Sequence, residues 1–347
     1  MGYYVGLDVS LDTVCVCIVD EQGKVIKEEG VPSTPEAIGG YLLGTGLKIT
    51  KIGLESGNLT HYLTKGLLSM KYEVVVMESR KMAAILAVTI NKTDKNDARG
   101  IANALRVGHY KSCVHRSDDS LETRTLLNGR GTLVDERTHL VSSIKGHLKV
   151  YGIKLGKGKD KTFRQKVETS ISKLRDCVQK TIKALLNVLD VLDVEIKKLD
   201  KEVIHLGRED ADVELLQSID GVGPITALAF KAEMDNPARF KNSKDTGAYL
   251  GLTPTQYSSG ETQRQGGISK CGSRRTRCLL VEAATSLLMR SKKWSKLKAW
   301  GMKLMKKKGA KKAIVAVARK MAVMMHRMLI TKEPFKRTDK PKEEKVA

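Results

Sequence analysis

The first part of the chain alternates short apolar runs with amphipathic segments, a pattern typical of a mixed α/β unit. Runs rich in apolar and β-branched residues predict strands at residues 3–10, 13–20, 24–30, 49–55 and 72–77. Segments of helical periodicity begin near residues 35 and 59, and two more helices close the unit. Three antiparallel strands followed by alternating helix and strand is the order of a ribonuclease-H-like fold.

A long helical segment follows, from about residue 118 to residue 206. Apolar residues recur there at alternating spacings of three and four, at Ile182, Leu185, Leu189, Leu192, Ile196, Leu199, Val203 and Leu206. This repeat predicts a coiled-coil seam. Leu126, Leu133 and Leu140 indicate an earlier helix, which Gly129 and Gly131 weaken. The spacing leaves open an intramolecular helical hairpin or a dimerisation arm.

Residues 209–212 are expected to form a polar linker to a third unit at 213–329. The start of that unit, residues 216–227, is similar to the turn of a helix-hairpin-helix, where glycines let backbone amides approach a phosphate. An ordinary turn between helices is an equal alternative. We therefore expect an α/β domain at 1–112, a helical coiled-coil region at 113–210, a mostly α domain at 211–332 and a disordered tail at 333–347.

The net charge of the 347 residues is +23, and it is unevenly distributed. Residues 290–332 contain 15 Lys or Arg and no Asp or Glu, whereas the rest holds 47 basic against 39 acidic residues. Such a surface attracts nucleic acid by counterion release. An anionic membrane surface or a merely solvated basic face are the alternatives.

The cellular setting follows from what the sequence lacks. The chain shows no signal peptide and no run of eighteen apolar residues, so no membrane role is expected. Its six cysteines form no Cys-x-x-Cys pair, and no His spacing completes a zinc pattern. We expect reduced thiols in a cytoplasmic protein.

Four acidic residues stand out against this basic background. Asp8 lies within the first apolar strand, Glu55 ends the fourth, and Asp94 and Asp97 are three apart on one helix face. Carboxylates that share a pocket repel one another unless a cation compensates them. An all-oxygen set suits Mg²⁺ or Mn²⁺, and two such ions can stabilise the attacking and leaving oxygens of a phosphodiester. Each acid alone is also compatible with an exposed helix position, and one of Thr93 and Asp94 with a helix N-cap.

A second group of candidate residues lies between 251 and 312. Ser258 and Ser259 precede a glycine in a segment with cations nearby. Serines in that setting are most often turn residues, and a nucleophilic serine needs activation by a metal or a neighbouring cation. The expected nucleic-acid contacts are Arg264, Lys270, Arg274, Arg275, Arg277, Lys306, Lys307, Lys308, Lys311 and Lys312.

Taken in order, seven short segments resemble the insertion-sequence-110 family of bacterial transposases, relatives of the Piv-type DNA invertases. They are residues 6–10, 54–57, 92–98, 218–223, 251–254, 259–260 and 268–272, the last followed by Arg277. The resemblance spans nearly the whole chain. One departure is Asp220, where the family usually has Pro, and it stiffens that turn less.

The resemblance implies a RuvC-like domain with an Asp-Glu-Asp-Asp metal site, a coiled-coil linker and a transposase domain with a catalytic serine. By this resemblance Asp8, Glu55, Asp94 and Asp97 hold the metal, and Ser259 is the nucleophile, while Ser258 has no assigned role. Family members resemble strand-exchange recombinases that link serine to a DNA 5′-phosphate. A structured bridge RNA pairs with donor and target DNA, and composite sites form in a tetramer, a dimer of dimers.

Three other functions compete with this interpretation. A metal-dependent nuclease such as a junction resolvase would use the four acids and water. A sugar kinase or related ATPase also opens on a segment like residues 6–10, but no later phosphate-binding segment or P-loop is present. A DNA-packaging protein would need only the basic surface. Aromatic residues make up only 4%, which favours backbone contacts, with sequence read by RNA pairing, over base stacking.

Overall fold

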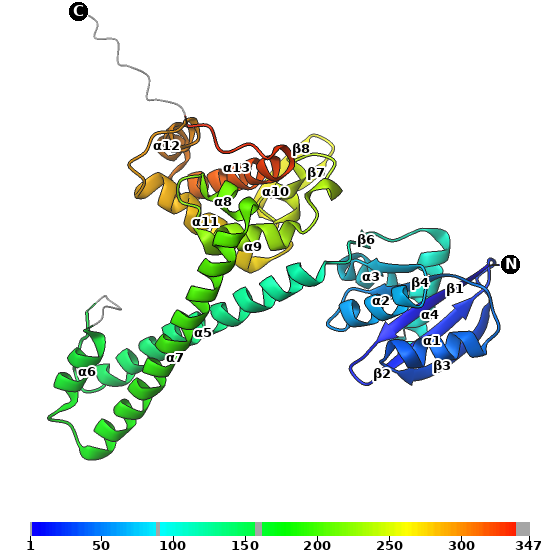
Figure 1. Ribbon diagram of the computed structural model, residues 1–347, viewed down its shortest axis with the longest axis horizontal. Helices are drawn as coiled ribbons and strands as arrows, with labels where there is room; N and C mark the ends of the chain where they lie inside the picture. The colour runs from blue at the N-terminus through cyan, green and yellow to red at the C-terminus, as the bar shows by residue number, and fades with distance from the viewer. Residues whose placement is uncertain (1, 88–90, 157–161, 338–347) are drawn as a thin grey trace, which may run out of the picture. The chain divides into compact units, whose positions relative to one another are not determined.

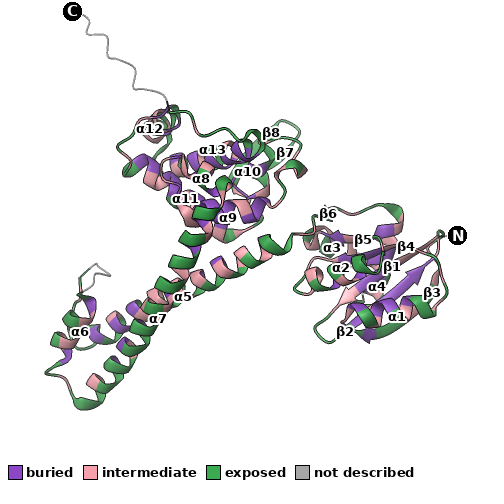
Figure 2. Cartoon of the chain, in the orientation of Figure 1, coloured by how far each residue is buried: buried purple, intermediate pink, exposed green. Residues whose placement is uncertain are grey.

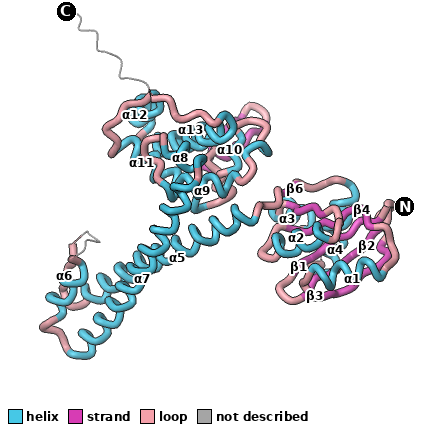
Figure 3. Tube along the Cα trace, viewed as in Figure 1, coloured by secondary structure: helices cyan, strands magenta, loops and turns pink. Residues whose placement is uncertain are grey.

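A computed structural model describes residues 2–87, 91–156 and 162–337 of the chain. The chain divides into two compact units, Met1–Arg116 and Ser117–Ala347. The first unit combines a β-sheet with helices, whereas the second consists mostly of helices (Figure 3). The fold is therefore mixed α/β at the start and mostly α afterwards, as the sequence predicts.

The first unit contains one mixed sheet with the strand order β3-β2-β1-β4-β5-β6. β1 pairs antiparallel with β2 and parallel with β4, while β2–β3 is antiparallel, β4–β5 parallel and β5–β6 antiparallel. The strands are β1 Tyr3–Val9, β2 Thr13–Val19, β3 Val25–Pro32, β4 Ile49–Glu55, β5 Val74–Met77 and β6 Ser112–Cys113. Five of them match the apolar runs of the sequence, and β6 is an addition.

Helices cover both faces of this sheet (Figure 1). On one face, α1 (Pro35–Gly44) and α2 (Thr60–Ser69) pack their apolar side chains against Val5, Leu7 and Leu54. On the other face lie α3 (Ser79–Leu86) and α4 (Asp94–Val107). Because side chains alternate along a strand, the odd-numbered residues of β1 build the first core and the even-numbered ones face α4.

Two glycines bring α4 unusually close to the sheet. A Cβ on Gly6 would lie 2.1 Å from the Ala98 carbonyl oxygen and 2.4 Å from the Ala102 nitrogen. A Cβ on Gly53 would lie 3.3 Å from the Leu105 side chain of α4, as well as 2.7 Å from the Met77 side chain of β5. The start of α4 is therefore held directly over the backbone of β1.

The second unit begins with a long helical hairpin. α5 (Asp118–Lys149) packs along α7 (Asp176–Glu209), and α6 (Phe163–Ile171) lies between them in the sequence (Figure 1). Every seventh residue of the predicted seam is buried, namely Ile182, Leu189, Ile196 and Val203. The intervening residues Leu185, Leu192, Leu199 and Leu206 are only half-buried. The seam thus closes a hairpin within this chain.

The first hairpin helix runs without a break through the two glycines that were expected to weaken it. Gly131 is buried, and a Cβ there would overlap the guanidinium of Arg275. Arg130 Nε also donates to Asp200 Oδ1 at 2.5 Å, which ties α5 to α7. Tertiary packing therefore outweighs the low helix propensity of glycine here.

The remainder of the second unit surrounds one apolar cluster that includes Phe230, Leu280 and Met321. Its elements are α8 Ala211–Gln217, α9 Pro224–Met234, a 3-10 turn at Pro237–Arg239, α10 Asp245–Tyr249, β7 Pro254–Ser259, β8 Thr262–Ile268, α11 Arg274–Met289, α12 Lys296–Lys308 and α13 Ala310–Thr331. Buried residues concentrate in this helical body, while much of the α5–α7 hairpin is exposed (Figure 2).

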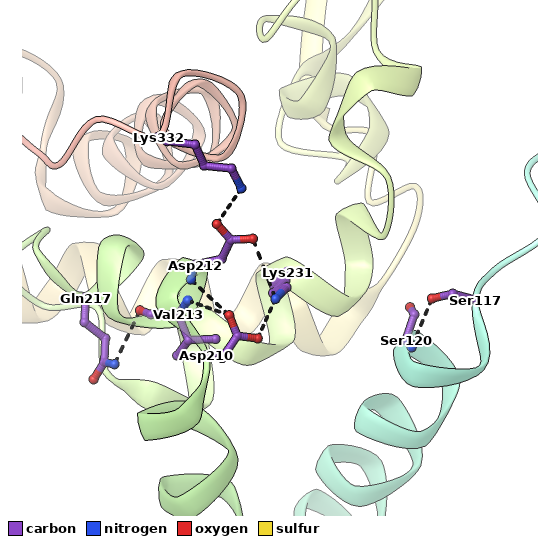
Figure 4. A network of polar contacts seen from close by, with 8 residues as sticks. All are labelled: Ser117, Ser120, Asp210, Asp212, Val213, Gln217, Lys231 and Lys332. Atoms are coloured by element: carbon purple, nitrogen blue, oxygen red, sulfur yellow. Dashed lines mark hydrogen bonds and ion pairs between the residues drawn. The ribbon is translucent and has the colours of Figure 1, made fainter.

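The expected polar linker at 209–212 is wrong, because these residues form an ordered junction (Figure 4). Asp210 accepts hydrogen bonds from the backbone nitrogens of Asp212 and Val213 and thereby caps α8. Lys231 Nζ lies 2.5 Å from Asp210 Oδ2, and Lys332 Nζ lies 2.6 Å from Asp212 Oδ1. These ion pairs join the end of α7 to α9 and to the end of α13.

The turn between α8 and α9 serves packing. Gly221 has φ +93°, and a Cβ there would lie 2.5 Å from the Ala283 carbonyl oxygen of α11. This close approach favours the ordinary turn between helices over a phosphate-binding hairpin.

The tail was expected to be disordered from residue 333 onward, and for its first five residues this is wrong. The Phe335 nitrogen donates to Ser218 Oγ at 2.9 Å, and Arg337 pairs with Asp220 at 2.9 Å. Both contacts fasten residues 333–337 to the α8–α9 turn. Residues 338–347 lie outside the described residues.

The most apolar stretch of the chain, residues 313–325 of α13, belongs to the helical core. Ala313, Val317 and Met321 are fully buried there, and Arg319 and Lys320 point outward. Among the helices of the described ranges, none has both the length and the apolar character needed to cross a lipid bilayer.

Candidate active site

Asp8 and Glu55 are neighbours on adjacent parallel strands. Leu7 of β1 pairs with Leu54 of β4, so the two acids follow at the same level, near the carboxyl ends of both strands. Strand alternation places them on the same face as Gly6 and Gly53, which is the face covered by α4. Both side chains are half-buried.

Helix α4 brings the other two acids to this face. Thr93 is the N-cap, since its side chain accepts a hydrogen bond from the Asn96 nitrogen at 3.2 Å. Asp94 and Asp97 therefore occupy the first turn, where negative charge is favourable. Asp97 is 8% exposed, whereas Asp94 is open to solvent.

The four acids act on one another electrostatically. Burial, followed by the negative charges of Asp97 and Asp94, raises the pKa of Asp8 above its ordinary value. Burial, followed by the charges of Asp8 and Asp97, raises the pKa of Glu55. Lys92 acts in the opposite direction on both pKa values. The structure thus gathers the acids in one neighbourhood.

This neighbourhood has the donor chemistry of a hard divalent cation, but its side chains are not arranged as a finished metal site. No three His, Cys, Asp or Glu residues in the described part of the chain are placed to hold one ion together. Carboxylates such as Asp8 and Glu55, whose pKa values neighbouring negative charges raise, are the groups that a cation would stabilise. A bound cation would therefore have to draw these side chains closer.

Sequence reasoning missed one member of this neighbourhood, Cys15. It pairs with Asp8 across β1 and β2, so both side chains share a face. Burial, and then the charge of Asp8, raises the pKa of the Cys15 thiol. Counting in twos along the two strands, with the turn at 10–13 as the reference, would have placed it there.

Ser259 lies in the second unit, at the end of β7, in the hairpin formed with β8. Ser259 pairs with Thr262, and Gly260 adopts φ +53° in the two-residue turn between them. Ser258 pairs with Gln263 and faces the opposite side of the ribbon. Both serines are exposed.

The register assigns one cation to the face of Ser259. Arg264 pairs with Tyr257, two residues before Ser259, so it occupies the diagonal position on the same side. Such diagonal residues lie about 7–8 Å apart between backbones, which a long side chain spans. Arg264 is exposed and suited to contact a phosphate beside the serine.

Arg277 closes the base of this hairpin. Its Nη1 donates to the carbonyl oxygens of Leu250 at 2.8 Å and of Cys271 at 2.6 Å, one on each side of the hairpin. Gly251, with φ +66°, lies against the Cys271 backbone with no room for a side chain. Arg277 is only 8% exposed. Nη1 thus holds the backbone of the hairpin base, and the direct contact of Arg277 with nucleic acid stays a prediction.

The other expected nucleic-acid contacts divide between surface and packing positions. Arg275 is half-buried against Gly131, and its Nη2 lies 3.9 Å from Asp135. The remaining ones are exposed, at the hairpin base, the start of α11, the end of α12 and the start of α13: Lys270, Arg274, Lys306, Lys307, Lys308, Lys311 and Lys312.

Comparison with known proteins matches both units. A model of the DEDD-type IS110 transposase family matches residues 5–153, and a model described as the transposase IS116/IS110/IS902 family matches residues 213–299. The first match contains all four acids and the second contains Ser259. Together these two regions cover more than half of the chain.

Individual relatives align along most of their length. The transposase for insertion sequence element IS1111A of Coxiella burnetii is 28% identical, over 95% of this chain and 90% of its own. A probable family 20 transposase of Pseudomonas aeruginosa is 25% identical, over 80% and 83%. The transposase for insertion sequence element IS1328 of Yersinia enterocolitica is 25% identical, over 69% and 71%.

Proposed function

Because this chain belongs to the IS110 family of insertion-sequence transposases, we propose that it cuts and rejoins DNA through attack by Ser259. The observation that carries the proposal is the β7–β8 register, which presents Ser259 on an exposed turn with Arg264 on the same face. The acid neighbourhood of the first unit supplies the second half of the chemistry.

We assign the first unit a ribonuclease-H-like, RuvC-like role. The strand order, with an antiparallel β1–β2–β3 meander and parallel β4 and β5, supports it. Asp8, Glu55 and Asp97 would hold Mg²⁺ or Mn²⁺ directly, with exposed Asp94 nearby. When bound, such ions stabilise negative charge on the oxygens of a phosphodiester under attack.

The serine step exchanges one phosphodiester for another. The Ser259 oxygen forms a bond to the phosphorus, and the bond from phosphorus to the 3′ oxygen of the preceding nucleotide breaks. The serine proton passes to solvent and the departing 3′ oxygen takes one up, which leaves a 5′-phosphoserine link and a free 3′-hydroxyl. Attack by another 3′-hydroxyl reverses the step on a new strand, so rejoining needs no nucleotide cofactor.

Selection of the DNA is proposed to rest on a bridge RNA that pairs with donor and target strands. The exposed lysines at the end of α12 and the start of α13 support backbone binding of such duplexes. The half-buried side of the α7 seam, with Val188 and Val191 exposed beside it, supports assembly into a dimer of dimers. The proposed place of action is the nucleoid, in the bacterial cytoplasm.

A metal-dependent nuclease that uses water is the second candidate. The acid neighbourhood would by itself support a nuclease of this kind, and the match of residues 5–153 to the DEDD-type transposase family is compatible with it. The two mechanisms differ in whether the protein becomes attached to DNA.

The test is recombination of the element by Ser259→Ala, with Ser258→Ala as the matched control. Ser259→Ala should abolish both recombination and the covalent protein–DNA adduct, because the hydroxyl is the proposed nucleophile. Ser258→Ala should retain both, since Ser258 faces the other side of the hairpin. Recombination by Ser259→Ala at an undiminished rate would eliminate the serine mechanism in favour of water.

A further inference from the structure

The positive charge of the chain is concentrated in two segments, and only one of them was among the expected nucleic-acid contacts. Residues 290–332 hold 15 Lys or Arg and no Asp or Glu, and residues 145–183 hold 12 against 3. The stretch between them, 184–289, holds 13 basic against 15 acidic residues. The excess of +23 thus arises from two separate basic segments.

The second basic segment forms one small folded body at the end of the α5–α7 hairpin, which we call the arm tip (residues 145–156 and 162–183). Its core combines the end of α5, all of α6 and the start of α7. The buried residues of this cluster include Leu148, Phe163, Val167, Ile171 and Ile182. Because the three elements share a core, the charged side chains of residues 145–156 and 162–183 surround a single body.

Part of this charge is neutralised by ion pairs, but much of it is not. Arg164 pairs with Glu168 at 2.8 Å and also with Asp190. Lys180 pairs with Asp176 at 2.6 Å. Among the described contacts, no ion pair is recorded for five exposed cations: Lys149, Lys154, Lys173, Arg175 and Lys183. Like charges on so small a body repel one another, and a polyanion would relieve that repulsion.

We propose that the arm tip is a second nucleic-acid-binding surface, which holds the sugar-phosphate backbone of a duplex. Four of the five cations are lysines, which contact phosphate as point charges. The ten-residue stretch of α7 after the tip, 184–193, contains no Lys or Arg. The basic surface therefore ends abruptly along the arm, and the contact is confined to the tip.

The helix fixes how far along DNA this contact lies. α7 has 34 residues, which at ~1.5 Å per residue corresponds to about 50 Å between its ends. At ~3.4 Å per base pair this length equals roughly 15 base pairs. At its other end α7 packs against α8 and α9 of the helical body. A short duplex bound to the body is thus out of reach of the arm tip, whereas a long one extends to it.

The experiment measures affinity against duplex length with the full-length protein. The variant carries Lys149→Gln, Lys154→Gln, Lys173→Gln and Lys183→Gln. On a DNA duplex of about 50 base pairs at ~0.1 M salt it should bind at least about tenfold more weakly, with a salt slope shallower by about 3. On a duplex of about 12 base pairs its affinity should stay within about twofold of the parent.

The matched control removes four exposed charges from the other end of the same helix, through Lys197→Gln, Lys198→Gln, Lys201→Gln and Arg208→Gln. This control should change the affinities for the short and the long duplex by the same factor. An RNA duplex of the longer length, run in parallel, identifies which nucleic acid the tip holds. Equal loss on short and long duplexes, no loss on either, or loss only on anionic vesicles would each overturn the proposal.

A second measurement keeps the charges intact. Cys177 is exposed at the start of α7, within the arm tip. A DNA-cleaving chelate attached there, with exposed Cys278 replaced by Ser, should cut a long duplex about 15 base pairs from the point held by the helical body. Absence of localised cleavage would contradict the proposal even if the glutamine variant fails to fold. The outcome is independent of Ser259, since neither assay involves strand cleavage by the protein.

Discussion

At the scale of single residues, the proposed chemistry depends on a few charged side chains that are partly or wholly buried. Asp8 and Glu55 have raised pKa values because burial and the negative charges of neighbouring carboxylates disfavour their ionised forms. Arg277 is the opposite case, a buried cation whose Nη1 donates to two carbonyl oxygens. The two acids would be stabilised by a bound cation, whereas Arg277 holds the backbone at the base of the hairpin.

The raised pKa of Asp8 makes stability depend on pH. Between the ordinary Asp value of 3.8 and the raised native value, the folded state binds more protons than the unfolded state. The free energy of unfolding should therefore fall as pH rises through this window. Asp8→Asn should flatten that fall in urea titrations between about pH 4 and pH 7, whereas exposed Asp12→Asn should leave it unchanged.

A divalent cation should restore the free energy of unfolding that is lost when Asp8 ionises. Mg²⁺ at ~100 times its dissociation constant would add about 2.7 kcal/mol to the free energy of unfolding. This gain should disappear in Asp8→Asn and persist in Asp12→Asn. Equal stabilisation of both variants by Mg²⁺ would mean that the ion binds elsewhere.

Arg277 is expected to position the serine hairpin. Arg277→Met leaves the buried Leu250 carbonyl and the part-buried Cys271 carbonyl without this donor, and an unsatisfied buried group costs about 1–3 kcal/mol. The rate of adduct formation at saturating DNA should fall at least about tenfold, with DNA affinity nearly unchanged. Exposed Arg274→Met is the control, and unchanged adduct formation by Arg277→Met would show that the hairpin holds its direction without this residue.

At the scale of elements, glycine spacing sets the acid neighbourhood by letting α4 rest on β1. Gly6→Ala would place a methyl group 2.1 Å from the Ala98 carbonyl oxygen, so the helix must shift. Such overpacking costs about 1–3 kcal/mol and should also weaken Mg²⁺ binding. Gly30→Ala, where nothing lies within 4 Å, should do neither. Calorimetry of both variants checks this, and a well-tolerated Gly6→Ala would contradict the close approach.

Local signals predicted the elements well where the pattern was strong. A strand was expected at residues 49–55 because an apolar run there ends in a single acid, and β4 has these bounds. The β7–β8 hairpin was not foreseen, because its residues are almost all exposed and carry no apolar alternation. The Gly260 turn was its one usable signal. The predictions of a polar linker at 209–212 and of a disordered tail failed for another reason. Polar residues there form ion pairs with residues far away in the sequence, which no local pattern reveals.

At the scale of the whole molecule, charge separates the functions. The acids gather in the first unit, and the lysines gather at α12–α13 and at the arm tip of the second. The sequence predicted which acids and which serine to examine through their resemblance to a family. It did not predict that Arg277 faces inward or that the hairpin faces separate Ser259 from Ser258, since both depend on tertiary contacts and register.

The account depends above all on the identity of the atom that attacks DNA. The most direct measurement is mass spectrometry of a protease-digested protein–DNA complex trapped during strand cleavage. We predict a nucleotide attached through its 5′-phosphate to the peptide that contains Ser259, with a free 3′-hydroxyl on the other DNA end. Cleaved DNA that carries no peptide, with a 5′-phosphate released to water, would contradict it.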